Sequence, residues 1–200
     1  MGTEGRLRAV LLDLDGTLVD HGAALARAFA EVGRELDVDF TGLDRAGVRP
    51  ALPGRHAMDH FRAAYARAIR PYADARPVVD QLLEAGLRVG ILADGGDEDL
   101  GQASAALAAL GVAADQVTLL TPSDLPAARP DPRAYLAACA AVGASPQETV
   151  VVGDDHALDV RGALDAGLAA VWVNRRDRRD SEDAPTLPTL DGLPGLLATL

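Results

Sequence analysis

The chain has no lysine, so arginine supplies all 19 of its strongly basic side chains, against 30 acidic ones. The formal net charge is therefore -11. Affinity for nucleic acids depends on basic side chains that displace counterions from the phosphates. The acidic balance disfavours a nucleic-acid partner.

Cysteine and long apolar runs are also scarce. Cys139 is the single cysteine, which excludes an internal disulfide and argues against a disulfide-stapled secreted scaffold. Residues 1–8 lack the apolar core of a signal peptide, and no apolar run is long enough to span a bilayer. We therefore expect a cytoplasmic protein without a membrane partner.

Short apolar runs alternate with helical patterns along the chain. Helical patterns cover residues 100–110 and 132–142, and residues 175–184 are expected to form a charged, solvated loop. This alternation predicts an α/β fold with a parallel sheet covered by helices on both faces. The apolar runs are residues 7–14, 88–93, 117–120, 149–153 and 169–174.

One part of the chain breaks this alternation. Helical patterns at residues 23–36 and 58–73 flank a glycine- and proline-containing loop between residues 42 and 54. This part is predicted to be a small helical cap inserted after the first strand. The predicted division is a core domain of residues 1–19 and 76–200 and a cap of residues 20–75.

Carboxylates follow several of the predicted strands. Asp13, Asp94, Asp154 and Asp155 lie where apolar runs end. The carboxyl ends of parallel strands meet at one edge of a sheet, so these side chains are expected to converge. Carboxylates that converge without lysine repel one another unless a cation offsets their charge. Magnesium is the usual cation where phosphate is also bound, so we predict a Mg²⁺ site.

Residues 13–18, Asp-Leu-Asp-Gly-Thr-Leu, follow the first strand directly. Asp13 and Asp15 lie two residues apart, so one carboxylate can attack a substrate while the other handles protons. Gly16 permits a tight turn, and the hydroxyl and amide of Thr17 can donate hydrogen bonds to a phosphate. Taken alone, the same pattern also fits an ordinary turn after a strand.

These residues resemble the first motif of the haloacid dehalogenase superfamily. Residues 153–159 resemble its fourth motif, a Gly-Asp pair with a further aspartate downstream. Further similarity runs through residues 159–163, 166–167 and 171–175. The resemblance implies a Rossmann-like parallel sheet with a cap after the first strand.

The resemblance also implies a magnesium-dependent phosphatase that acts on a small-molecule phosphate monoester. Asp13 would form an aspartyl-phosphate, and Asp15 would act as general acid and then general base. Magnesium would be held by Asp13, the Asp15 carbonyl and Asp154. Asp155 or Asp159 would complete or orient that set of ligands.

The chain departs from the family pattern at two motifs. Ala93 stands where a Thr or Ser usually donates to the phosphoryl group, so a backbone amide of Asp94 or Gly95 is expected to serve instead. The carboxylate of Asp94 is expected to contact Arg129 or a cationic group of the substrate. Arg129 replaces the usual lysine while keeping its Pro-Asp-Pro context.

The predicted cap supplies further candidates. His21 begins it and is expected to line the entrance to the site. Four further residues on or near its loop are candidates for contacting the non-phosphate part of the substrate: Arg49, Arg55, His56 and His60. Of these, Arg55 is predicted to bind the substrate. Residues of these types are also common on solvated helix surfaces.

Two alternatives to a phosphatase remain open. A phosphomutase would use the same aspartyl-phosphate and return its phosphoryl group to a sugar. A catalytically impaired relative would act as a ligand-binding or regulatory protein, which Ala93 and Arg129 favour and the intact Asp13, Asp15 and Asp154 oppose. The sequence leaves open a monomer or a homodimer.

Overall fold

The computed structural model describes residues 7–43, 45–94, 100–176 and 182–200. The strands are β1 (Ala9–Asp13), β2 (Arg88–Leu92), β3 (Thr118–Leu120), β4 (Thr149–Gly153), β5 (Ala169–Val173) and β6 (Thr186–Leu187). The helices are α1 (His21–Leu36), α2 (Arg45–Ala51), α3 (Gly54–Ala68), α4 (Ala75–Glu84), α5 (Leu100–Leu110), α6 (Pro132–Ala141), α7 (Gly162–Asp165) and α8 (Leu193–Leu197). A π-helix, His156–Arg161, precedes α7. None of the helices in these described ranges is long and apolar enough to cross a membrane.

The strands form one parallel sheet in the order β3-β2-β1-β4-β5-β6. β1 lies inside the sheet, with Ala9 opposite Arg88 of β2 and Thr149 of β4. All five residues of β1 are buried, as expected for a strand covered on both faces. The predicted Rossmann-like α/β fold is confirmed.

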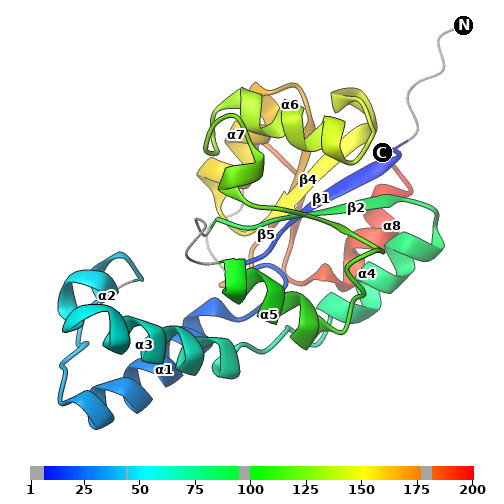
Figure 1. The fold of residues 1–200 in the computed structure, drawn as a ribbon. Coiled ribbons are helices and arrows are strands. Elements are labelled where there is room, and N and C mark those ends of the chain that lie inside the picture. Colours follow the sequence, from blue (N-terminus) through cyan, green and yellow to red (C-terminus); the bar gives the residue numbers. More distant parts are fainter. Residues whose placement is uncertain (1–6, 44, 95–99, 177–181) are drawn as a thin grey trace, which may run out of the picture.

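Side chains alternate between the two faces of the sheet, and each face has its own core. Val10 and Leu12 of β1 join a core that contains residues of α4, α5 and α8. Ala9 and Leu11 join a second core that contains residues of α6 and α7. Figure 1 shows these two groups of helices on opposite sides of the strands. The prediction of helices on both faces is therefore correct.

The chain between β1 and α4 forms a helical segment, residues 21–68, that projects from the sheet (Figure 1). Helix α1 buries Ala24, Ala28 and Val32, which recur every four residues on the face that meets α3. The rings of Phe29 and Phe61 lie 5.7 Å apart and join the two helices through an aromatic contact. These side chains extend the core on the α4, α5 and α8 face of the sheet into the segment.

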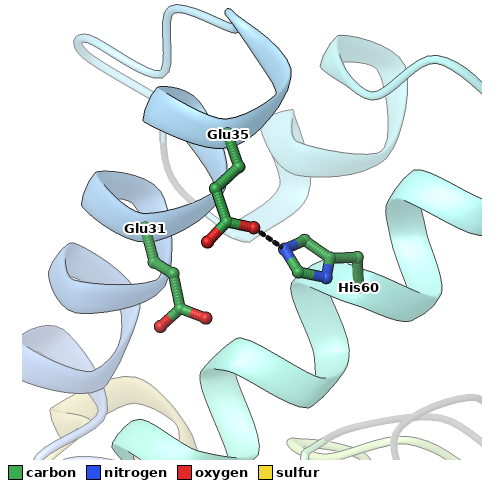
Figure 2. Close-up of side chains that lie close together, drawn as sticks. All are labelled: Glu31, Glu35 and His60. Carbon is green, nitrogen blue, oxygen red and sulfur yellow. Dashed lines mark ion pairs between the residues drawn. The ribbon is translucent and has the colours of Figure 1, made fainter.

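Charged contacts also join α1 to α3. Glu31 and Glu35 on α1 face His60 on α3 (Figure 2). A carboxylate oxygen of each glutamate and a ring nitrogen of the histidine lie within 4.8 Å of one another. His60 Nε2 lies 2.7 Å from Glu35 Oε2, and Arg67 Nη2 lies 2.5 Å from Glu31 Oε1. Each carboxylate thus faces a nitrogen of a basic side chain, and the cluster links the two helices.

Two predictions about this segment were wrong. The helix predicted over residues 58–73 ends at Ala68, because the residue before Pro71 is disfavoured in a helix and Pro71 forms a bridge to Val19. The loop predicted between residues 42 and 54 contains α2. Val48 of α2 is 3% exposed, so burial against the segment's interior stabilises a helix despite the nearby glycines and prolines.

Arg175 corrects the prediction of a solvated loop over residues 175–184, of which residues 177–181 lie outside the described ranges. Its side chain is 11% exposed and pairs with Asp74, both N–O distances being 2.9 Å. Arg175 also donates to the carbonyl of Thr17 at 2.8 Å, and the amide of Leu190 donates to Asp74 at 2.7 Å. This network joins the end of β5 to the turn after β1, the start of α4 and the C-terminal region.

We expect Arg175→Met to lower the free energy of unfolding by about 3 to 5 kcal/mol, because the buried Asp74 carboxylate would lose its counter-charge. Arg76→Met is the matched control, since the Arg76–Asp80 pair is far more exposed and its loss should cost about 1 kcal/mol or less. Urea unfolding of both variants tests this. Equal losses would contradict a structural role for the Arg175 network.

Candidate active site

Five polar side chains gather where strands end at one edge of the sheet. Asp13 is the last residue of β1, and Asp94 follows β2 by two residues. Asp154 follows β4 directly, and Asp159 lies in the π-helix after it. Arg129 enters from the loop before α6, joined to Pro130 by a cis peptide bond. The predicted convergence at the carboxyl ends of the strands thus includes a cation as well as carboxylates.

Arg129 lies at the centre of this group with its side chain 5% exposed. Its Nη2 donates to Asp13 Oδ1 at 2.9 Å and to Asp94 Oδ1 at 2.5 Å. Its Nη1 donates to Asp159 Oδ1 at 2.6 Å. The planar fork therefore reaches three carboxylates at once, which the ammonium of lysine could not do with the same fixed geometry. The sequence hypothesis of an Asp94–Arg129 contact is confirmed.

Asp159 and Asp155 have different roles in the structure. Asp159 is fully buried, and its second oxygen accepts the amide of Asp155 at 2.9 Å. Asp155 Oδ1 accepts the amides of Ala157 and Leu158, at 2.8 and 3.0 Å, and so caps the π-helix. The structure brings Asp159 into the carboxylate group and uses Asp155 to hold the backbone beside it.

Two glycines allow carboxylates to lie against the main chain. Gly16 has φ +94°, and a Cβ there would overlap the Asp154 carboxylate. A Cβ at Gly153 would overlap the carboxylate of Asp159. The glycines therefore create the space that Asp154 and Asp159 occupy next to Asp13.

Burial and mutual repulsion raise the pKa of the central carboxyl groups. The pKa of Asp13 lies well above its usual value because of burial first and the charge of Asp159 second, with Arg129 acting against both. Burial raises the pKa of Asp159 to about 7 although Arg129 lowers it. Burial lowers the pKa of Arg129, but Asp13, Asp159 and Asp94 outweigh it and raise the pKa overall. One guanidinium thus only partly offsets the negative charge of the group.

The donor set fits a divalent cation. Asp13, Asp154 and Asp159 each offer a carboxylate oxygen, and these atoms lie within 4.8 Å of one another. Hard oxygen ligands of this kind suit Mg²⁺, and its charge would relieve the repulsion that one arginine leaves. Trp172 steadies this group, since its Nε1 donates to the carbonyl of Asp154 at 3.0 Å.

Several residues that the sequence predicts to bind phosphate lie elsewhere, are buried or form other hydrogen bonds. The amide of Ala93 donates to the carbonyl of Leu120 at 2.9 Å, so it is committed to the sheet. Thr17 is fully buried, and its hydroxyl has no hydrogen-bond partner among the described residues. Gly95 lies outside the described residues. The side chain of Asp94 is 44% exposed.

Arg55 lies at the far end of α3 from the sheet. It is the second residue of that helix, whereas Tyr65 near the other end contacts His21. Ten residues at about 1.5 Å each separate the two positions by about 15 Å along the helix axis. Arg55 instead lines a hollow within the segment, together with Arg49, Met58 and Arg62.

Asp15 lies at the junction of the sheet and the helical segment. Its Oδ2 is 3.9 Å from His21 Nδ1, and its side chain is 22% exposed. His21 Nδ1 is in turn 2.5 Å from the hydroxyl oxygen of Tyr65 on α3. The sequence places His21 near the entrance, but nothing in it singles out Tyr65, because helical spacing makes Tyr65 an ordinary core residue.

A cavity of about 290 Å³ opens beside the group and is lined by Asp94, Arg129 and the apolar side chains of Leu92, Leu120 and Leu158. A larger hollow of about 890 Å³ lies at the opposite end of the sheet, between the start of β2, the end of α4 and α8. The smaller cavity adjoins Asp94 and Arg129 of the carboxylate group, so it is the candidate substrate entrance.

The chain matches the haloacid dehalogenase-like hydrolase family over residues 7–167. It belongs to that family. The family match spans β1 to the residues after α7, and therefore covers all five side chains of the candidate site. The resemblance inferred from the sequence motifs is confirmed.

Relatives of this hydrolase have different activities. A (S)-2-haloacid dehalogenase 4A from Burkholderia cepacia is 32% identical over 199 residues, which cover 85% of this chain and 84% of that protein. A phosphoserine phosphatase from Thermus thermophilus is 34% identical over 133 residues, or 66% of this chain and 51% of the relative. The crystal structure of a HAD phosphatase from Thermococcus onnurineus has a TM-score of 0.74 and 25% identity, covering 96% of this chain and 98% of that one.

The raised pKa of Asp159 predicts how pH affects the metal-free hydrolase. The folded state holds this proton up to about pH 7, whereas the unfolded chain loses it near pH 4. The free energy of unfolding should therefore fall as pH rises from about 4 to about 7. Thermal unfolding in a chelator should show Asp159→Asn to be more stable than wild type above about pH 7.

Mg²⁺ provides the control for this measurement. The cation should stabilise wild type at neutral pH more than it stabilises Asp159→Asn, because the variant offers a weaker ligand and less charge. Parallel pH profiles of the two proteins in chelator, with equal responses to Mg²⁺, would contradict the charge repulsion inferred at Asp159.

Proposed function

We propose that this hydrolase is a magnesium-dependent phosphatase that hydrolyses a small-molecule phosphate monoester through an aspartyl-phosphate on Asp13. The observation that carries the proposal is the placement of Asp13. It is buried at a strand end, oriented by Arg129 and grouped with Asp154 and Asp159, while Asp15 stands two residues further on. This combination supplies a nucleophile, a cation site and a separate proton donor.

In the first step, an Asp13 carboxylate oxygen attacks phosphorus. A bond forms between that oxygen and phosphorus as the bond from phosphorus to the leaving oxygen breaks. Asp15 gives its proton to the leaving oxygen, so the alcohol departs neutral. Arg129 donates to Asp13 Oδ1 and fixes the orientation of the carboxylate.

In the second step, Asp15 accepts a proton from water. The water oxygen bonds to phosphorus, the bond from phosphorus to Asp13 breaks, and inorganic phosphate is released. Asp13 returns as a carboxylate and Asp15 again carries a proton. Transfer of the phosphoryl group to a sugar hydroxyl in place of water would give the phosphomutase variant of the same chemistry.

Asp13, Asp154 and Asp159 would hold the magnesium ion, together with the backbone carbonyl of Asp15. The ion, when bound, offsets the charge between the carboxylates and the phosphoryl oxygens. Asp155 supports this set through its cap on the π-helix, which fixes the amide that Asp159 accepts.

Phosphate recognition here relies on charge in place of a hydroxyl. Ala93 has no donor left for the phosphoryl group, whereas Arg129 lies among Asp13, Asp94 and Asp159 with several N–H groups. Loss of a charge-assisted hydrogen bond from the hydroxyl position costs about 1.5 to 3 kcal/mol, or roughly ten- to hundredfold in rate. We therefore expect a low rate of turnover. The alternative of a catalytically impaired relative predicts no turnover at all.

Dehalogenation of a 2-haloacid is the second candidate, favoured by the similarity to the Burkholderia cepacia enzyme. Its displacement step also needs a carboxylate nucleophile, which Asp13 would provide. Departure of halide needs no proton donor, however, and the nucleophile needs no group of metal ligands. The presence of Asp15 and the cluster of Asp13, Asp154 and Asp159 therefore support phosphate over halide.

We expect the wild type to hydrolyse an aryl phosphate in a Mg²⁺-dependent way and Asp13→Asn to lose at least about a thousandfold of this rate, because the nucleophile is removed. Phosphate release with and without chelator measures it. Chloride release from 2-chloropropionate is assayed in parallel. Asp13-dependent halide release without phosphate release would establish a dehalogenase instead. The absence of both activities on a broad metabolite panel would support the non-enzyme alternative.

Asp94→Asn should lower the KM for phosphate monoesters without a cationic group by roughly three- to tenfold, because a carboxylate beside the dianionic phosphoryl group is removed. The Asn oxygen can still accept from Arg129, so kcat should change little. Steady-state kinetics over esters with and without an ammonium group measure this. Unchanged KM values across the panel would count against a role for Asp94 at the substrate.

A further inference from the structure

His21 lies between Asp15 on the core side and Tyr65 on the helical segment. The same atom, His21 Nδ1, is 2.5 Å from Tyr65 Oη and 3.9 Å from Asp15 Oδ2. The two rings meet edge to face, with centroids 5.5 Å apart and planes at 61°. Tyr65 therefore holds the imidazole in the orientation that turns Nδ1, and not a ring carbon, towards Asp15.

Backbone hydrogen bonds fix the distance from Asp15 to His21. The amide of Gly16 donates to the carbonyl of Val19 at 2.9 Å, and the amide of His21 donates to the same carbonyl at 2.9 Å. Asp20 then caps α1 by accepting the amide of Ala23 at 2.9 Å. His21 thus starts a helix whose first turn is tied to the turn that carries Asp15.

Tyr65 is held in place by the helical segment, as His21 is held by the turn that carries Asp15. It is 2% exposed, packs near Phe61 and lies one turn before the end of α3. The chain leaves the segment there and pairs with the entering chain, the amide of Asp20 donating to the carbonyl of Arg70 at 3.0 Å. The contact between His21 and Tyr65 therefore lies at the junction where the segment meets the core.

We propose that His21 and Tyr65 are positioning residues that orient the Asp15 carboxyl for proton transfer to the leaving oxygen. In the tautomer that carries the proton on Nδ1, a shift of about 1 Å would let this single N–H be shared between Tyr65 Oη and Asp15 Oδ2 as a three-centre hydrogen bond. A small movement of the segment over a substrate would complete this contact. Tyr65 makes this contact depend on the placement of α3. The inference rests on the proposed function, since it assigns Asp15 the role of acid.

The leaving group provides the test, because a good leaving group needs little protonation and a poor one needs much. We expect Tyr65→Phe and His21→Ala to lower kcat/KM for phenyl phosphate roughly tenfold more than for dinitrophenyl phosphate. Asp15→Asn should show the same pattern more strongly. His21→Asn, whose amide can replace Nδ1 as a polar contact, should restore part of the loss.

Arg67→Gln is the matched control, since it removes another contact between α1 and α3, at Glu31 and away from Asp15. It should affect both esters equally and by less than about twofold. Equal losses on both esters in Tyr65→Phe and His21→Ala, with Asp15→Asn still selective, would overturn this inference and leave the phosphatase intact. Absence of Asp13-dependent turnover in wild type would overturn the phosphatase, and the inference with it.

Discussion

One guanidinium holds three carboxylates together at the carboxyl end of the sheet. Arg129 pairs with Asp13, Asp94 and Asp159, although these come from three separate stretches of the chain. Without a counter-charge, the buried Asp13 and Asp159 would be forced to keep protons or move apart. The arrangement of the candidate site depends on this balance of charge, and so would the proposed binding of a divalent cation and the proposed reactivity of Asp13.

The sheet and the polar group at its edge were predictable from the sequence, because both rest on local patterns. Each buried strand is a short apolar run, and Asp13, Asp94 and Asp154 come at or just after the ends of such runs. Parallel strands bring their carboxyl ends together whatever the details of the connections. The motif around Asp13 then added the expected chemistry, which the family match supports at the level of a hydrolase.

Other features depended on contacts between distant residues, which no local pattern encodes. Arg175 reads as part of a charged loop, yet its partner Asp74 lies about a hundred positions earlier in the chain. Thr17 reads as a donor for phosphate, yet packing buries its side chain completely. Helix α2 forms among glycines and prolines because Val48 is buried. In each case tertiary packing decided against the preference of the local sequence.

The helical segment enters and leaves the sheet through two short stretches that are hydrogen-bonded to each other, Asp20 to Arg70 and Leu18 to Tyr72. Its beginning and end are therefore neighbours in space, while its apolar interior continues the core on the α4, α5 and α8 face of the sheet. A segment attached in this way can be replaced by another of different length without altering the strand order. The substrate range, which the segment would set, and the chemistry at the edge of the sheet can accordingly diverge at different rates. His21 and Tyr65 lie at the junction between these two parts.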